Sequence, residues 1–191
     1  MPQFLRHPWY RPSRLIILLA VLCLALVLSI VGVRAAHADS GPLTIPGHTC
    51  ADTPSNRTCQ GQDPVADRCE FDARTIESAP ALLHGRGIGH VDLRYSPACM
   101  SYWTRTVAYA NSSISQVKAY MDLAGSFNEP VPTNPDGTLG SNETGELISS
   151  SQRAADGSLT VYSDMAFDSH TPVGGEIDFS DGTPPVVVML P

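Results

Sequence analysis

Alternation of apolar and polar residues is the clearest pattern in this chain, and it predicts short strands. Residues 90–96 alternate strictly, with Val91, Leu93 and Tyr95 on one side and Asp92, Arg94 and Ser96 on the other. This pattern is typical of a half-buried strand, which Pro97 ends. Residues 102–109 are a second candidate, with one side made of Trp103, Arg105, Val107 and Tyr109.

The rest of the pattern extends this picture to most of the chain. Residues 114–123 fit a strand or a helix face, and we favour the strand. Further short strands are expected at 147–151, 159–165, 175–179 and 186–190, with turn signals at Asp156-Gly157, Gly174-Gly175 and Asp181-Gly182. A short helix is expected at 72–79, with Asp72 as its cap and Pro80 ending it. Short strands at this spacing predict a mainly β fold, a small antiparallel sandwich or barrel.

One apolar segment precedes this β-rich part. Residues 15–33 carry no charge, follow a basic stretch and lead to Ala36-His37-Ala38, an A-x-A cleavage sequence. A run of 19 residues is longer than most signal peptides need and approaches the length of a membrane-spanning helix. Residues 1–38 are therefore predicted to be a signal peptide or an amino-terminal membrane anchor, formed by one hydrophobic helix. Either alternative sends the following residues outside the cytoplasm.

The content of proline and glycine divides the exported part into a linker and a β-rich domain. Residues 39–58 hold few apolar groups and several turn formers, which indicates a linker. Residues 59–191 form the predicted β-rich domain. Within it, residues 125–146 hold three prolines and four glycines and are expected to form a long loop or insertion.

Charge excludes two classes of partner for the exported part. All 19 acidic residues lie at or beyond Asp39, whereas four of the 12 basic residues precede it, so residues 39–191 carry a formal net charge of −11. Nucleic-acid binding requires a basic face that displaces counterions, so nucleic acid is not expected as a partner. Contact with a membrane is expected only through residues 15–33, if they are not cleaved off.

Cysteine usage supports export and predicts covalent cross-links. Four cysteines follow the apolar segment, and an even number in an exported domain indicates two disulfides. Four cysteines allow three pairings, of which we favour Cys50–Cys59 and Cys69–Cys99, because the first two share one polar, turn-rich stretch. Zinc is the competing interpretation, but gaps of 8, 9 and 29 residues do not fit the usual ligand spacing.

No catalytic signature or cofactor motif is present, so no catalytic residue, metal or cofactor is predicted. The stretch from His84 to His90 alternates glycines between two histidines, but a flexible loop explains it better than a metal or anion site. Acidic clusters are better explained as solvated surface than as calcium ligands. They are Asp63, Asp67, Glu70 and Asp72, and then Asp164 and Asp168.

The densest group of aromatic and cationic residues is Arg94, Tyr95, Trp103 and Arg105. Arginine beside aromatic rings can hold a carboxylate or a sugar by forked hydrogen bonds and stacking. These residues are the candidate binding site. The alternative is structural, with the arginines paired to Asp63 or Asp72 and Trp103 filling the core.

Three blocks of residues, with their cysteines in register, resemble a known family. They are Cys59-Gln60-Gly61-Gln62-Asp63-Pro64, Cys69-x-x-Asp72-Ala73-x-Thr75 and Leu93-Arg94-Tyr95-Ser96-x-x-Cys99-x-x-x-Trp103-x-Arg105. They resemble the YjfA-like family, domain of unknown function 2690. The resemblance implies an exported bacterial protein and supplies no activity.

Three hypotheses about function follow. The first is a disulfide-linked β domain, secreted or on the extracellular face of the membrane, that binds an unknown ligand or cell-surface component or has a structural role. The second is an exported hydrolase that uses the carboxylates of Asp164 and Asp168 with His170. The third is a membrane-anchored extracytoplasmic sensing domain.

Overall fold

A computed structural model describes residues 49–123, 131–141, 145–167, 171 and 173–190. Every described residue belongs to one compact unit of the chain, Gly41–Pro191. The predicted signal peptide or anchor and the first half of the predicted linker, residues 39–48, lie outside the described residues, as do Asp168 and His170. Within the described part, no helix has the length and apolar character needed to cross a membrane.

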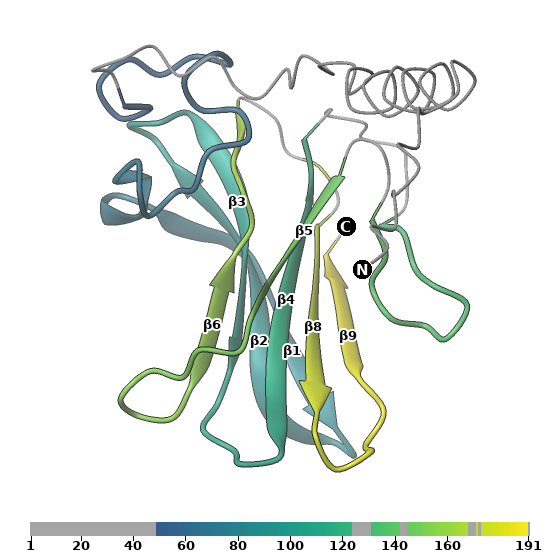
Figure 1. Ribbon diagram of the computed structural model, residues 1–191. Coiled ribbons are helices and arrows are strands. Elements are labelled where there is room, and N and C mark those ends of the chain that lie inside the picture. The colour runs from purple at the N-terminus through teal and green to yellow at the C-terminus, as the bar shows by residue number, and fades with distance from the viewer. Residues whose placement is uncertain (1–48, 124–130, 142–144, 168–170, 172, 191) are drawn as a thin grey trace, which may run out of the picture. The chain divides into compact units, whose positions relative to one another are not determined.

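The fold is mainly β and consists of two antiparallel sheets (Figure 1). The first sheet, sheet A, has the strand order β1-β2-β3-β6, with β7 also paired to β3. Its strands are β1 (Arg74–Leu83), β2 (Arg86–Ser96), β3 (Ser101–Ala108), β6 (Leu159–Tyr162) and β7 (Ala166–Phe167). The second sheet, sheet B, has the order β5-β4-β8-β9. Its strands are β4 (Ile114–Asp122), β5 (Gly145–Ser150), β8 (Val173–Phe179) and β9 (Val186–Leu190).

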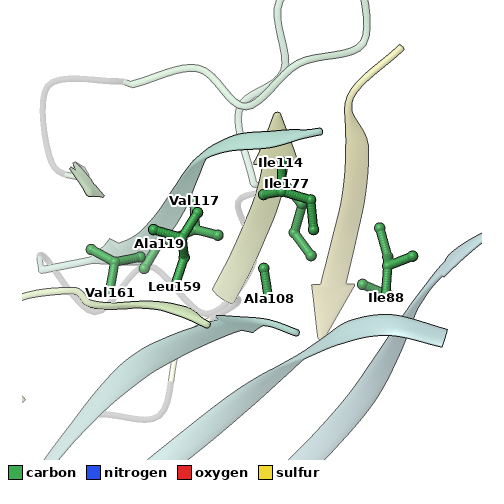
Figure 2. Packing of buried hydrophobic residues seen from close by; sticks show 9 residues of the cluster. Ile88, Ala108, Ile114, Val117, Ala119, Leu159, Val161 and Ile177 are labelled. Carbon is green, nitrogen blue, oxygen red and sulfur yellow. The ribbon is translucent and has the colours of Figure 1, made fainter. Parts of the chain in front are cut away.

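Apolar side chains from both sheets form the core between them (Figure 2). One cluster joins five residues of sheet A to four of sheet B: Ala81, Ile88, Ala108, Leu159 and Val161 with Ile114, Val117, Ala119 and Ile177. A polar contact also joins the two sheets, because the Thr104 hydroxyl donates to the Tyr120 carbonyl over 2.6 Å. The alternation of residues along each strand therefore does place one face of each sheet in the core, as the sequence predicts.

The predicted turn at Gly174-Gly175 is wrong, because both glycines lie within β8. A Cβ on Gly175 would stand 2.3 Å from Thr106 Oγ1 and 2.4 Å from Val91 Cγ2, so this glycine lets sheet B approach sheet A closely. A Cβ on Gly174 would instead approach Leu139 and Val131, on the opposite face. The glycine pair thus provides close packing on both faces of one strand, which a sequence pattern cannot distinguish from a turn.

The predicted helix at 72–79 is also wrong. Residues 74–83 form β1, whose Ser78 and Pro80 lie opposite Asp92 and His90 of β2. Pro80 is tolerated because β1 is at the edge of sheet A, where a missing N–H removes no ladder hydrogen bond. The carboxylate of Asp72 does not cap a helix, because it accepts hydrogen bonds from Ser96 Oγ and from the Ala98 amide. Pairing with β2 overrides the local helix signal.

The remaining strand predictions agree with the observed elements to within a few residues. Residues 114–122 are a strand, β4, and the turn glycines Gly157 and Gly182 have φ angles of 81° and 84°. Of the segment expected at 159–165, only residues 159–162 form a strand, β6, and β7 begins after it at Ala166. Between the two strands, the Ser163 hydroxyl accepts a hydrogen bond from the amide of Thr104. In the predicted loop at 125–146, residues 131–141 carry a turn closed by the Thr133–Leu139 bridge, and β5 begins at Gly145.

The two disulfides are those favoured from the sequence, Cys50–Cys59 and Cys69–Cys99. All four cysteines are fully buried, together with Trp103 and Met165. They fix the cysteine-rich segment, residues 49–73, against one end of sheet A. Such cross-links indicate an oxidising environment outside the cytoplasm.

Candidate functional site

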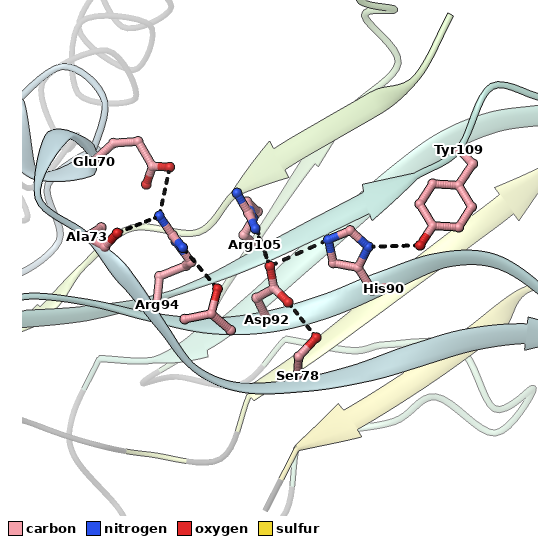
Figure 3. A network of polar contacts seen from close by, with 9 residues as sticks. Glu70, Ala73, Ser78, His90, Asp92, Arg94, Arg105 and Tyr109 are labelled. Carbon is pink, nitrogen blue, oxygen red and sulfur yellow. Dashed lines mark hydrogen bonds and ion pairs between the residues drawn. The ribbon is translucent and has the colours of Figure 1, made fainter.

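The first candidate binding residue, Arg94, is held within the fold. Its guanidinium donates to Glu70 Oε1 at 3.2 Å, to the Ala73 carbonyl at 3.0 Å and to Thr75 Oγ1 at 2.9 Å. Only 11% of its side chain is exposed. These bonds tie β2 to the end of the cysteine-rich segment, so most of its donors are already in use (Figure 3).

The aromatic members of the predicted site lie on different faces of sheet A. Trp103 is fully buried and packs among the four half-cystines. Tyr95 lies on the face opposite to Arg94 and contacts Tyr102, with 4.5 Å between ring centroids. Arg74 lies over the ring of Tyr95 at 5.7 Å. The structure therefore does not bring these four residues into one open surface, and their role in binding stays a prediction.

The fourth member, Arg105, belongs to a network of polar contacts centred on Asp92. From the sequence, Asp92 was expected only to lie on the polar face of a strand. Asp92 has a side chain that is 3% exposed, and it accepts two hydrogen bonds from the Arg105 guanidinium, one of them at 2.9 Å from Nε. Ser78 donates to its other oxygen at 2.6 Å. A buried carboxylate requires such partners, so this group stabilises the outer face of sheet A (Figure 3).

The same network reaches the surface through His90. Its Nε2 lies 3.5 Å from Asp92 Oδ2, and its Nδ1 lies 3.4 Å from the hydroxyl of Tyr109 (Figure 3). The histidine tautomer decides whether Nδ1 or the tyrosine hydroxyl is the donor in this contact. The ring centroids of His90 and Tyr109 are 5.9 Å apart. Asp92 thus orients His90, which in turn orients a half-exposed tyrosine.

Tyr109 borders a hollow at the turn between β1 and β2. This hairpin hollow has a volume of about 820 Å³, within the range of small-molecule sites. Its walls are the hairpin turn and the segment that follows β3, made of Leu83, His84, Arg86, Gly87, Ile88, Tyr109, Ala110, Asn111 and Ser112. His84 and Gly85 form the turn itself, both with positive φ. The prediction of a flexible loop from His84 to His90 is therefore wrong: the stretch is a tight turn followed by the start of β2, and its first residues form one wall of the hollow.

The two histidines of that stretch do not form a metal site, because His84 is at the turn and His90 is in the Asp92 network. Among the described residues, one group has ligand atoms close enough to hold a metal ion, namely Cys50, Cys69 and Cys99. Their sulfurs are bonded in disulfides. Two of the acidic residues considered for calcium are engaged separately, since Glu70 pairs with Arg94 and Asp72 accepts from Ser96.

The acidic residue Asp164 has an environment that its sequence neighbours did not indicate. Burial, together with a hydrogen bond and charge repulsion from Glu146, raises the pKa of the Asp164 carboxyl to about 7. Asp164 follows β6 in sheet A and Glu146 lies on β5 in sheet B. The partner of Asp164 is thus a residue 18 positions earlier, which only the fold brings near.

Comparison with known protein families gives one match, which covers most of the described part of the chain. The model described as "Protein of unknown function (DUF2690)" matches residues 57–173. The match extends well past Arg105, where the resemblance seen in the sequence motifs stops, and it includes β4 to β7. No curated protein and no solved structure matches the chain. Because the match covers more than half of the chain, this protein belongs to the DUF2690 family of proteins of unknown function.

Proposed function

We propose that this protein is an exported binding domain whose ligand site is the hairpin hollow. The observation that carries the proposal is a cavity lined by Arg86, whose side chain has no partner among the described residues, on a β scaffold cross-linked by two disulfides. We further infer that the scaffold is a β-sandwich rather than a barrel, since the two sheets pack face to face through a shared apolar cluster. Secretion, or exposure on the extracellular face of the membrane, follows from the cysteines and the amino-terminal sequence.

The position of the hollow supports binding rather than a purely structural role. The side chains of Arg94 and Trp103 are held inside the fold, whereas the side chain of Arg86 has no ion pair or hydrogen bond with any described residue. Exposed arginine in a concave site is a common feature of ligand recognition.

Two measurements test the proposal. Intact mass of the protein as its host exports it should give a chain that begins at Asp39 and gains four hydrogens on reduction. A membrane-bound product that begins near Met1 would favour the sensing alternative. The exported protein should also bind the cell envelope of its host, and Gly87→Phe should abolish this binding. Equal binding by the variant would show that the hollow is not the site.

One observation favours the hydrolase alternative. A carboxyl group with a pKa of about 7, as at Asp164, can donate a proton at neutral pH. Its expected partners Asp168 and His170 lie outside the described residues. Incubation of the exported protein with cell-wall and glycan substrates tests this alternative. Product release by the wild type, lost in Asp164→Asn, would support a hydrolase, and no release from any substrate would exclude it for that panel.

A further inference from the structure

The hairpin hollow differs in charge from the rest of the exported chain. Residues 39–191 carry a net charge of −11, yet none of the residues that line the hollow has a carboxylate. The lining residues instead include Arg86 and His84. The carboxylates on the two turns beside the hollow are already engaged, Asp181 with Thr183 and Ser113 and Asp156 with Ser158. A cationic cavity in an acidic protein selects for an anionic group.

Arg86 is the residue suited to hold that group. Eight basic side chains follow Asp39, and six of them contact a partner: Arg68, Arg74, Arg94, Arg105, Lys118 and Arg153. Arg86 and Arg57 have no such partner among the described residues. Of these two, only Arg86 lines the hollow. Its planar guanidinium matches the two oxygens of a carboxylate with parallel hydrogen bonds.

The other walls of the hollow suit the ring and hydroxyl groups of a sugar. Tyr109 is 50% exposed, and its hydroxyl is held by His90, so its ring offers a fixed apolar face. Asn111 Oδ1 accepts from the Ser113 amide at 2.9 Å, which leaves the amide NH₂ of Asn111 as a donor. A free phosphate or acetate could use the arginine and the amide but not the aromatic face.

We propose that the hairpin hollow binds a short acidic saccharide, with its carboxylate on Arg86 and a ring face against Tyr109. This inference rests on the proposed function, and it adds the chemical class of the ligand. His84, Asn111 and Ser112 supply polar groups for the hydroxyls of the sugar.

Gly87 allows the hollow to be filled without a change in charge. A Cβ at this position would meet no atom within 4 Å, so a larger side chain would extend into open space. Gly87→Phe is therefore an occlusion variant, and Arg86→Ala removes the cation. Arg57→Ala is the matched control, because it removes an exposed, unpartnered arginine from the cysteine-rich segment. Thermal melting of all three variants checks that each is folded.

Calorimetric titration of the full exported protein with trigalacturonic acid, galactose and inorganic phosphate tests the proposal. We expect trigalacturonic acid to bind at least about tenfold more tightly than either of the others. Arg86→Ala should weaken that binding at least about tenfold, Gly87→Phe should abolish it, and Arg57→Ala should change it less than about twofold.

Three results would overturn the proposal. They are no heat of binding with millimolar trigalacturonic acid, equal affinity for phosphate, and equal losses in Arg86→Ala and Arg57→Ala. If envelope binding still depends on Gly87 while trigalacturonic acid fails, the ligand class is wrong and the proposed function stands. If envelope binding is itself independent of Gly87, the proposed function fails.

Discussion

The two sheets of this protein are covered on their outer faces in different ways. The cysteine-rich segment covers sheet A and is held by two disulfides that pack on Trp103. Residues 131–141 cover sheet B, where Val131 and Leu139 pack on Tyr120. A buried charge holds them: Glu176, which is fully buried, accepts hydrogen bonds from the Leu139 amide and from Lys118. The cysteine-rich segment is thus held on sheet A by covalent bonds, and residues 131–141 are held on sheet B by a buried charge. Different mutations should therefore release the two segments.

Removing a disulfide of the cysteine-rich segment is expected to cause the largest loss of stability. Cys69→Ala with Cys99→Ala opens a loop of about 31 residues and should lower the free energy of unfolding by about 3.7 kcal/mol on the chain-entropy model. The same change at Cys50 and Cys59 opens about ten residues and should cost about 2.7 kcal/mol. Urea denaturation measures both. An equal loss of unfolding free energy in the two double variants, or no loss, would show that the disulfides do not stabilise the fold as the chain-entropy model predicts.

The packing of residues 131–141 on sheet B should depend on the charge of Glu176. Glu176→Gln leaves Lys118 partly buried with Asp178 alone, 2.9 Å away, and should cost about 2–3 kcal/mol. Hydrogen exchange at the Leu139 amide should accelerate, because this amide donates to the lost carboxylate. Asp178→Asn, at a more exposed position, is the control and should cost less than about 1 kcal/mol. Unchanged exchange at Leu139 in the glutamine variant would show that Glu176 does not hold residues 131–141.

The glycine pair of β8 compares the inner and outer faces of sheet B directly. Gly175→Ala places a Cβ into side chains of sheet A and should cost about 1–3 kcal/mol. Gly174→Ala meets only Leu139 and Val131 side chains, at 3.1 Å, and should cost less than about 1 kcal/mol. Melting temperatures measure both. The reverse order would mean that residues 131–141 pack more rigidly on sheet B than sheet A does.

The smallest effect concerns Asp164 and depends on pH. The folded protein keeps its proton up to a pKa of about 7, whereas the unfolded chain loses it near pH 4. The stability contributed by this group is therefore complete below pH 4 and is lost as the pH rises through 7. Asp164→Asn should be more stable than wild type at pH 8 by about 1 kcal/mol, a value reduced for partial exposure, and should have no advantage at pH 4.

Asp156→Asn is the control for this pH dependence. Hydrogen bonds from Ser158 lower the pKa of the exposed Asp156 carboxyl, so its replacement should bring no gain at pH 8. A gain at Asp164 that is equal at pH 4 and pH 8 would contradict a raised pKa.

The β class, most strands and the disulfide pairing were predictable from the sequence, because alternation and cysteine spacing are local signals. The helix expected at 72–79 and the turn expected at Gly174-Gly175 failed for one reason. In each case a neighbouring strand or sheet, absent from any local window, decides the conformation. Pairing with β2 determines the first, and the close approach of Thr106 determines the second.

The candidate site was predictable only in part. The combination of arginine and tryptophan in the sequence suggested a binding site at Arg94 and Trp103. In the structure, Arg94 bonds to Glu70 and Trp103 packs in the core, so both stabilise the fold. Arg86 and Tyr109 are 23 positions apart, and only the pairing of β2 with β3 places them around one cavity. The alternating glycines after His84 were the available signal, since they mark a hairpin turn and an open position at Gly87.

Mapping of backbone amide signals in the isotope-labelled exported protein during titration with trigalacturonic acid tests the central claim most directly. The account predicts that the shifts concentrate at residues 83–88 and 109–112, around the hairpin hollow. Shifts concentrated around Arg94 and Trp103, or no shifts at millimolar ligand, would contradict it.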